Sequence, residues 1–288
     1  MARKKEDSTH QDPPTTGHSW DGIEEFDNPL PRWWLWTFYG SIVFAIVYSI
    51  LYPAWPLVNA ATPGLLGYST RAEVEKKIAR FDEMNAPVEA KLVEADLGAI
   101  PEDPELRNYA LNAGAAVFQT NCAPCHGSGA AGSKGYANLL DNAWLWGGTI
   151  DAIHTTIQHG IRNGQDPQAR NSQMPAWGPI LGEEGVAQVV QYVRRMSGQE
   201  ADAALAEKGA ELFATNCAAC HGPEGNGNKM LGAPALNDAI WLYGGDVATL
   251  TETLMNGRGG VMPPWQGRLS EADVRAVATY VHQLGGGQ

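Results

Sequence analysis

Two short motifs carry the residue types most suited to chemistry in this chain of 288 residues. They read Thr-Asn-Cys-Ala-Pro-Cys-His-Gly at residues 120–127 and Thr-Asn-Cys-Ala-Ala-Cys-His-Gly at residues 215–222. Each contains Cys-x-x-Cys-His, a spacing at which two thiols bond covalently to a haem and the next histidine ligates its iron. The sequence therefore predicts two covalently bound haem c groups. The residues concerned are Cys122, Cys125 and His126 in the first motif, and Cys217, Cys220 and His221 in the second.

Other kinds of site also use a Cys-x-x-Cys pair, and the match can arise by coincidence. A thioredoxin-like redox pair is expected in a βαβ context, which the surrounding pattern does not suggest. A zinc site needs further ligands that close a tetrahedron. All four cysteines lie in the two motifs, so none is left for a disulfide. The repeated histidine in an identical frame favours haem c.

A methionine is expected as the second axial ligand of each iron, because a thioether opposite a histidine is an arrangement of cytochromes c. Met174 and Met262 each precede a proline, after their motif and before the last helix of their repeat. His154 and His159 offer bis-histidine ligation instead, but neither is repeated in the second copy. Six-coordinate iron leaves no position for a substrate, which favours electron transfer over catalysis.

Several other side chains are expected near the haems or in the core. Arg162 and Arg258 follow turns that recur in the two copies, and each offers a guanidinium to a haem propionate or simply faces solvent. Tryptophans that recur in register are expected to pack on the haems or in the core, and three further methionines to fill gaps. These are Trp144, Trp241, Trp177 and Trp265, with Met196, Met230 and Met255.

The motifs belong to a longer repeat. Residues 114–127 match residues 209–222, the run Trp-Leu-Trp-Gly-Gly recurs as Trp-Leu-Tyr-Gly-Gly, and each copy closes with an amphipathic helix. The first copy has extra residues before its Met-Pro, which a turn can absorb. We expect two tandem class I cytochrome c domains, at residues 109–198 and 199–288, packed together in a mainly α fold.

An apolar run precedes the repeats, and we expect a single transmembrane helix at residues 33–53. Its length suits a hydrocarbon core of roughly 30 Å, and aromatic residues flank both ends. A signal peptide or a buried helix are the alternatives, but the run is long for a signal and no cleavage pattern follows. A polar tail with little structure is expected at residues 1–32, and a helical connector at residues 54–108.

The basic residues near the run predict its orientation. Arg3, Lys4, Lys5 and Arg32 precede it, whereas the first basic residue afterwards is Arg71. The positive-inside rule then leaves the N-terminus cytoplasmic and the remainder outside.

The connector is expected to form two helical pieces. Thr70 with Glu73 resembles a capping box, an apolar face follows it, and Pro87 interrupts the pattern. The formal net charge of the chain is −12, which disfavours nucleic-acid binding because phosphates require clustered Lys and Arg.

The run from Thr15 through the apolar segment to Val58 closely resembles the start of the membrane-anchored dihaem subunit, subunit III, of cbb3-type cytochrome c oxidases. Residues 81–118 are similar to the join between anchor and haem domains in that family, so the resemblance covers nearly the whole chain. It implies a bacterial inner-membrane protein with periplasmic haem domains, which passes electrons from a donor cytochrome c or the bc1 complex. The receivers are a monohaem cytochrome c subunit and then the catalytic haem–copper subunit, which reduces oxygen.

The resemblance also implies that His126 and His221 are the proximal ligands and that Met174 and Met262 are the distal ones. Members of the family suggest an exchange, with Met174 on the second haem and Met262 on the first, and the residues alone leave both pairings open. Two other functions are weighed against this one: a stand-alone anchored dihaem carrier and, more remotely, a dihaem peroxidase.

Overall fold

The structure, a computed structural model, describes residues 13–287 of the chain. Arg3, Lys4 and Lys5, on which the expected orientation depends, lie outside these residues. The chain divides into two compact units, residues 1–82 and residues 83–288, and each is described by itself.

The first unit contains a β-hairpin within the segment expected to be an unstructured tail. Strands β1 (Thr15–Trp20) and β2 (Ile23–Phe26) pair in antiparallel register. The two residues between them have positive φ angles, 54° at Asp21 and 83° at Gly22. Asp-Gly is a preferred pair for such a two-residue turn. The expectation of little structure is therefore wrong for these residues.

Helix α1 (Arg32–Leu51) follows, as predicted to within two residues at each end. An 18-residue window of this 20-residue helix has a mean hydropathy of 1.7, and none of the helix is buried within the chain. It is the one helix within residues 13–287 that is long and apolar enough to cross a membrane. At 1.5 Å per residue, its length matches a hydrocarbon core of about 30 Å.

Helix α2 (Thr70–Glu94) is continuous, contrary to the two pieces expected around Pro87. Its cap also differs from the expected one, because the Ser69 hydroxyl accepts the Ala72 amide at 3.3 Å. Beyond Pro87 the helix packs Leu92, which is fully buried, against the core of the second unit. This packing helps to offset the cost of a proline inside a helix, which is about 3 kcal/mol because one backbone hydrogen bond is lost.

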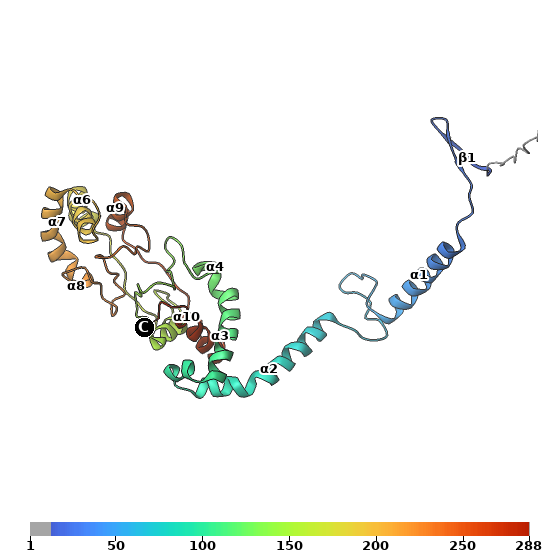
Figure 1. Cartoon of the computed structure of the whole chain (residues 1–288), viewed down its shortest axis with the longest axis horizontal. Coiled ribbons are helices and arrows are strands. Elements are labelled where there is room, and N and C mark those ends of the chain that lie inside the picture. The colour runs from blue at the N-terminus through green and yellow to red at the C-terminus, as the bar shows by residue number, and fades with distance from the viewer. Residues whose placement is uncertain (1–12, 288) are drawn as a thin grey trace, which may run out of the picture. The chain divides into compact units, whose positions relative to one another are not determined.

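The second unit is helical, and loops connect its helices (Figure 1). The 3₁₀ turn η1 (Leu97–Glu102) leads to α3, and a π-helical turn η2 (Phe118–Cys122) joins α3 to the first haem motif. The helices are α3 (Pro104–Val117), α4 (Ala123–His126), α5 (Ile150–His159), α6 (Gly178–Met196), α7 (Ala203–Asn216), α8 (Ala218–His221), α9 (Val247–Asn256) and α10 (Glu271–His282).

The two repeats exchange their last helices. Helix α10, from the second repeat, packs on α3 and α5 of the first, and α6, from the first repeat, packs on α7 and α9 of the second. Figure 1 accordingly shows α6, α7 and α9 grouped together, apart from α3 and α10. The predicted boundary at residue 198 separates the sequence repeats, but it does not separate the two cores.

Glycines let the exchanged helices approach closely. A Cβ atom at Gly114 of α3 would lie 2.3 Å from the carbonyl oxygen of Ala276 on α10. In the other core, a Cβ atom at Gly209 of α7 would lie 2.1 Å from the carbonyl oxygen of Gln188 on α6. Both distances are shorter than any van der Waals contact. The two crossings are therefore built alike and both need glycine.

A smaller cluster docks the end of the connector onto α3 and α10. Leu92 and Ile100 are fully buried there with Ala276 of α10. The Arg275 guanidinium donates hydrogen bonds to the carbonyl oxygens of Ala95 at 2.6 Å and Leu92 at 3.2 Å. The second repeat's last helix thus also holds the connector.

Candidate functional site: two Cys-x-x-Cys-His cores

Each motif histidine ends a four-residue helix and is oriented by one backbone carbonyl. The Nδ1 atom of His126 lies 2.9 Å from the Ala137 oxygen, and that of His221 lies 3.0 Å from the Pro234 oxygen. A carbonyl oxygen only accepts, so Nδ1 must carry the proton and Nε2 keeps its lone pair. An Nε2 lone pair with a fixed ring orientation is what a metal-ligating histidine requires.

In each motif the first cysteine is less exposed than the second. Cys217 is buried, Cys122 is half-buried, and Cys125 and Cys220 are exposed. Burial raises the pKa of the Cys122 and Cys217 thiols to about 11. A redox-active Cys-x-x-Cys pair needs the opposite, a thiol whose pKa is lowered. The chemistry of these pairs therefore argues against a thioredoxin-like site and fits covalent attachment of a group that enters from the open side.

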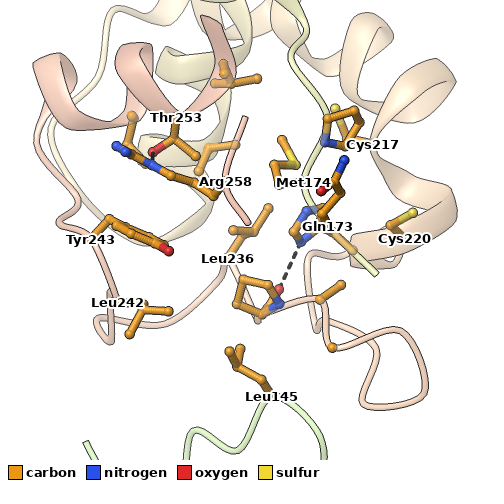
Figure 2. Close-up of a pocket in the computed structure, with 18 of the residues that line it drawn as sticks. Leu145, Gln173, Met174, Cys217, Cys220, Leu236, Leu242, Tyr243, Thr253 and Arg258 are labelled. Atoms are coloured by element: carbon orange, nitrogen blue, oxygen red, sulfur yellow. Dashed lines mark hydrogen bonds between the residues drawn. The ribbon is translucent and has the colours of Figure 1, made fainter. Parts of the chain in front are cut away.

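An apolar cavity adjoins the second motif. Its wall includes Cys217, Cys220 and His221 and, from the first repeat, Met174. In Figure 2, Met174 and the two cysteine sulfurs lie on one side of this cavity, whereas Arg258 and Tyr243 lie on the other. The methionine that the sequence pairs by position with the first motif thus lies beside the second.

The first core has the reciprocal arrangement. Met262, from the second repeat, packs in the same cluster as Cys122, Phe118 and Ile153 of the first repeat. The structure therefore brings each motif together with the methionine of the other repeat. This proximity is what an exchanged pairing of the methionines would require.

The two methionines lie on segments that cross between the cores. Met174 and Arg258 exchange both backbone hydrogen bonds, at 3.0 and 2.9 Å. Met262 and Ile161 do the same, also at 3.0 and 2.9 Å. Each methionine is therefore held by the strand-like segment that follows α9 or α5, and those segments belong to the opposite repeat.

Arg258 presents an unused donor to the cavity beside the second motif. Its Nε donates to the Thr253 hydroxyl at 3.0 Å, its Nη1 pairs with Glu252 at 3.0 Å, and its guanidinium lies 4.5 Å from the centre of the Tyr243 ring. Its Nη2 is buried and has no hydrogen-bond partner among the described residues. A buried cationic donor without an acceptor is costly. The donor set thus fits a ligand with a carboxylate, such as a haem propionate.

Arg170 occupies the matching place in the first core, and the sequence analysis missed it. Its Nε donates to the Thr156 hydroxyl at 2.9 Å, and its guanidinium lies 5.4 Å from the centre of the Trp146 ring. Trp146 has a buried Nε1 without a partner among the described residues. The available signal was that Thr156 and Trp146 align with Thr253 and Tyr243 in the repeats, whereas Arg170 itself lies in the unrepeated insertion.

Arg162, the residue expected to match Arg258, also lines the cavity beside the second motif but uses its donors differently. Its guanidinium donates to the carbonyl oxygens of Gly260 at 2.6 Å and of Ser172, and so it ties the two crossing segments together. The backbone pairs explain the difference, because Ile161, not Arg162, takes the place of Arg258.

The other singled-out side chains divide as follows. His154 pairs with Glu271 at 3.1 Å and His159 with Asp166 at 2.8 Å. Of the repeated tryptophans, Trp144 and Trp265 pack on the first core, and Trp177 and Trp241 pack on the second. Met196 and Met255 also pack on the second core. Met230 is the exception, since it is 86% exposed and does not fill a core gap as expected.

The fold and the site together define a membrane-anchored cytochrome c, with an apolar span followed by two helical cores that each hold a Cys-x-x-Cys-His motif. Residues 12–59 match the family described as the N-terminal domain of cytochrome oxidase-cbb3, FixP. Residues 110–193 and 204–281 match the family described as cytochrome c oxidase, cbb3-type, subunit III. The chain belongs to this family of oxidase subunits.

Curated relatives match over almost the full chain. The chain is 64% identical to the Cbb3-type cytochrome c oxidase subunit CcoP of Cereibacter sphaeroides, with 96% of each chain covered. It is 56% identical to the subunit of the same name in Rhodobacter capsulatus, with 99% of each covered. It is 52% identical to the subunit FixP of Azorhizobium caulinodans, over 96% of this chain and 94% of that one.

Membership of this family fixes the general role. The chain is an electron-transfer subunit of a cbb3-type oxidase, anchored in a membrane with other subunits, and haem c is its cofactor. It is a component of the oxidase complex without a catalytic site of its own.

Proposed function

We propose that the chain carries two haem c groups and passes single electrons through them toward the catalytic subunit of its oxidase. The observation that carries this proposal is the pairing of each motif with a methionine, Met174 beside Cys217 and His221 and Met262 beside Cys122. His221 and Met174 would ligate the second iron, and His126 and Met262 the first. Haem c, when bound, supplies an iron that exchanges one electron without gaining or losing a ligand.

The side chains around each site prepare it for that exchange. The carbonyl oxygens of Ala137 and Pro234 fix the histidine rings, which would hold each ligand in one orientation while an electron arrives. The cavity beside the second motif is lined mainly by apolar side chains, which would keep water away from a haem that fills it. Arg258, whose Nη2 has no partner among the described residues, would hold a propionate there, and Arg170 would take the corresponding role in the first core.

The crossing segments offer a short route between the two sites. The backbone of Met174 is hydrogen-bonded to that of Arg258. Only residues 259–261 separate Arg258 from Met262 in the chain. Both axial methionines would therefore lie on one short, doubly hydrogen-bonded backbone path. Arg162 braces this path through Gly260.

The partners follow from the anchor and the family. We propose that the chain receives electrons from a donor cytochrome c or the bc1 complex and delivers them to a monohaem cytochrome c subunit and the catalytic haem–copper subunit. The N-terminus would lie in the cytoplasm and the haem domains in the periplasm of a bacterial inner membrane. The absence of basic residues between Arg32 and Arg71 supports this orientation.

The ligand pairing is tested in proteins that keep one haem. In a chain with Cys217→Ala and Cys220→Ala, only the first haem is attached. There, Met262→Leu is expected to remove the methionine-to-iron charge-transfer band, and Met174→Leu to leave it. Loss of the band with Met174→Leu instead would show unexchanged ligation. Retention of the band in both variants would contradict His–Met ligation altogether.

The subunit role is tested by purification in mild detergent. A haem–copper subunit is expected to co-purify with the chain, and its absence would indicate a stand-alone dihaem carrier. The reduced protein is expected to react slowly or not at all with hydrogen peroxide, whereas fast oxidation at one iron would indicate a peroxidase.

A further inference from the structure

The loop that carries Met262 is held by a polar cluster, and within residues 13–287 no such cluster holds the loop that carries Met174. Asp166 lies at the centre of this cluster and is 7% exposed. It belongs to the extra residues of the first repeat. One of its oxygens, Oδ2, accepts from His159 Nδ1 at 2.8 Å and from the Gln266 amide. The other, Oδ1, accepts the Gln168 backbone N–H at 2.8 Å.

The cluster reaches both ends of the Met262 loop. Gln266 lies four residues after Met262, and its side-chain amide donates a hydrogen bond to Asp166. At the other end, Asn163 Nδ2 donates to the His159 carbonyl at 3.0 Å and to the Met262 carbonyl at 3.4 Å. The Asn163 carboxamide oxygen in turn accepts the Asp166 backbone N–H at 3.1 Å. The buried carboxylate and Asn163 therefore fix the methionine segment against α5.

The backbone frame beneath the cluster is common to both cores. Trp265 donates its N–H to the Ile157 carbonyl at 3.1 Å, and Trp177 donates to the Leu254 carbonyl at 2.7 Å. The side chains on this frame differ between the two cores. Gly178 follows Trp177 where Gln266 follows Trp265, and the place of His159 is taken by Asn256. The cluster therefore adds a second restraint to one loop only.

The charge state of Asp166 agrees with this geometry. Its pKa is lowered by the hydrogen bond from the Gln168 backbone and then by that from His159. A buried carboxylate that stays ionised holds its donors more firmly than a neutral group does.

We propose that Asp166 is a positioning residue that keeps Met262 over the first motif, so that the first haem resists displacement of its methionine more strongly than the second. This inference rests on the proposed ligation by Met262. The exogenous ligands concerned are small neutral bases that compete with a thioether for ferric iron.

Imidazole titration of the full-length dihaem protein tests the proposal. Asp166→Ala and Gln266→Ala are each expected to increase imidazole affinity at one haem by about tenfold, since hydrogen bonds to a charged group are lost. In each variant, the half of the methionine-to-iron charge-transfer band that belongs to this haem should be lost at about one tenth of the imidazole concentration that the wild type requires. Asn256→Ala, a change at the residue that takes the place of His159 in the second core, should leave both affinities unchanged. Unchanged affinities in Asp166→Ala and Gln266→Ala would overturn the proposal, as would an increase at the second haem.

Two further measurements assign the effect. Added to Met262→Leu, Asp166→Ala should cause no further increase in imidazole affinity; a full tenfold increase there would mean that Asp166 acts elsewhere. If Met262→Leu leaves the band of the unliganded protein intact, the proposed ligation fails rather than the positioning role. Hydrogen exchange provides a readout that does not depend on haem: amides of residues 262–269 should exchange faster in Gln266→Ala, and unchanged exchange would count against the clamp. Gln266→Ala leaves the Asp166–His159 pair in place and so guards against a general folding defect.

Discussion

The rings of Phe118 and Tyr280 lie 5.6 Å apart between centroids, although the two residues belong to different sequence repeats. Tyr192 and Phe213 form the same pair in the other core, at 5.2 Å. Each pair joins the segment before a haem motif to the last helix of the other repeat. Damage to α10 is therefore expected to appear at the first motif, and damage to α6 at the second.

The first prediction concerns the close crossing of α3 and α10. Gly114→Ala should destabilise the protein by about 1–3 kcal/mol, because the new methyl group overlaps backbone of α10 that must shift. Denaturant unfolding followed at the haem absorption bands measures the change. Gly129→Ala is the control, since a Cβ atom there meets nothing within 4 Å. Equal stability of the two variants would contradict the crossing.

The second prediction distinguishes exchanged from contiguous cores. Val277 of α10 is fully buried in the first core, and Val189 of α6 is 1% exposed in the second. Val277→Ala should cost about 2 kcal/mol through the cavity it leaves, and it should lower the temperature at which the first haem loses its charge-transfer band. Val189→Ala should act on the second haem. The opposite assignment would indicate that each repeat packs with its own last helix.

The third prediction concerns the hold of α10 on the connector. Arg275→Met removes the hydrogen bonds to the carbonyls of Ala95 and Leu92 while keeping most of the side-chain bulk. The free energy of opening this segment should fall by about 2 kcal/mol, as expected for hydrogen bonds from a charged donor. Hydrogen exchange of residues 88–95 measures it. Arg268→Met, on the loop before α10, should leave that exchange unchanged.

The fourth prediction is a pH dependence at the start of α9. The pKa of Asp246 is lowered by its side-chain and backbone hydrogen bonds to Thr249. Because the folded pKa lies below the unfolded one, Asp246 stabilises the fold above the unfolded pKa, about 3.9, and this contribution is lost as the pH falls through the folded pKa. Asp246→Asn keeps an N-cap but does not titrate. The stability difference between wild type and this variant should therefore shrink between pH 6 and pH 3, measured by denaturant unfolding. A constant difference would contradict the shift.

Local signals in the sequence predicted much of the fold. The haem motifs fall where expected, with His126 and His221 ending their short helices. The apolar run forms α1, and its length and composition suffice for that prediction. The sequence also contains a signal for the hairpin, because Asp21-Gly22 is a preferred pair for a two-residue turn. We predicted little structure there because the tail is polar.

The exchange of the last helices had no local signal. Gly114 and Gly209 prepare nearly identical crossings, so α6 and α10 suit either partner equally well by residue pattern. Which helix packs where depends on contacts between segments far apart in the chain. Arg170 was missed for a related reason, because an unrepeated insertion supplies the side chain that Arg258 supplies in the other core.

The exchange has a consequence for the order in which the sites are completed. The second core uses one uninterrupted stretch, from Met174 to the end of α9, and is thus a cytochrome core with its last helix moved to the front. The first core is split around it and closes only with α10. Chains are synthesised from the N-terminus, at about 5–20 residues per second. The motif at Cys122 is therefore made before the second motif but enclosed after it, because its final helix, α10, follows every element of the second core.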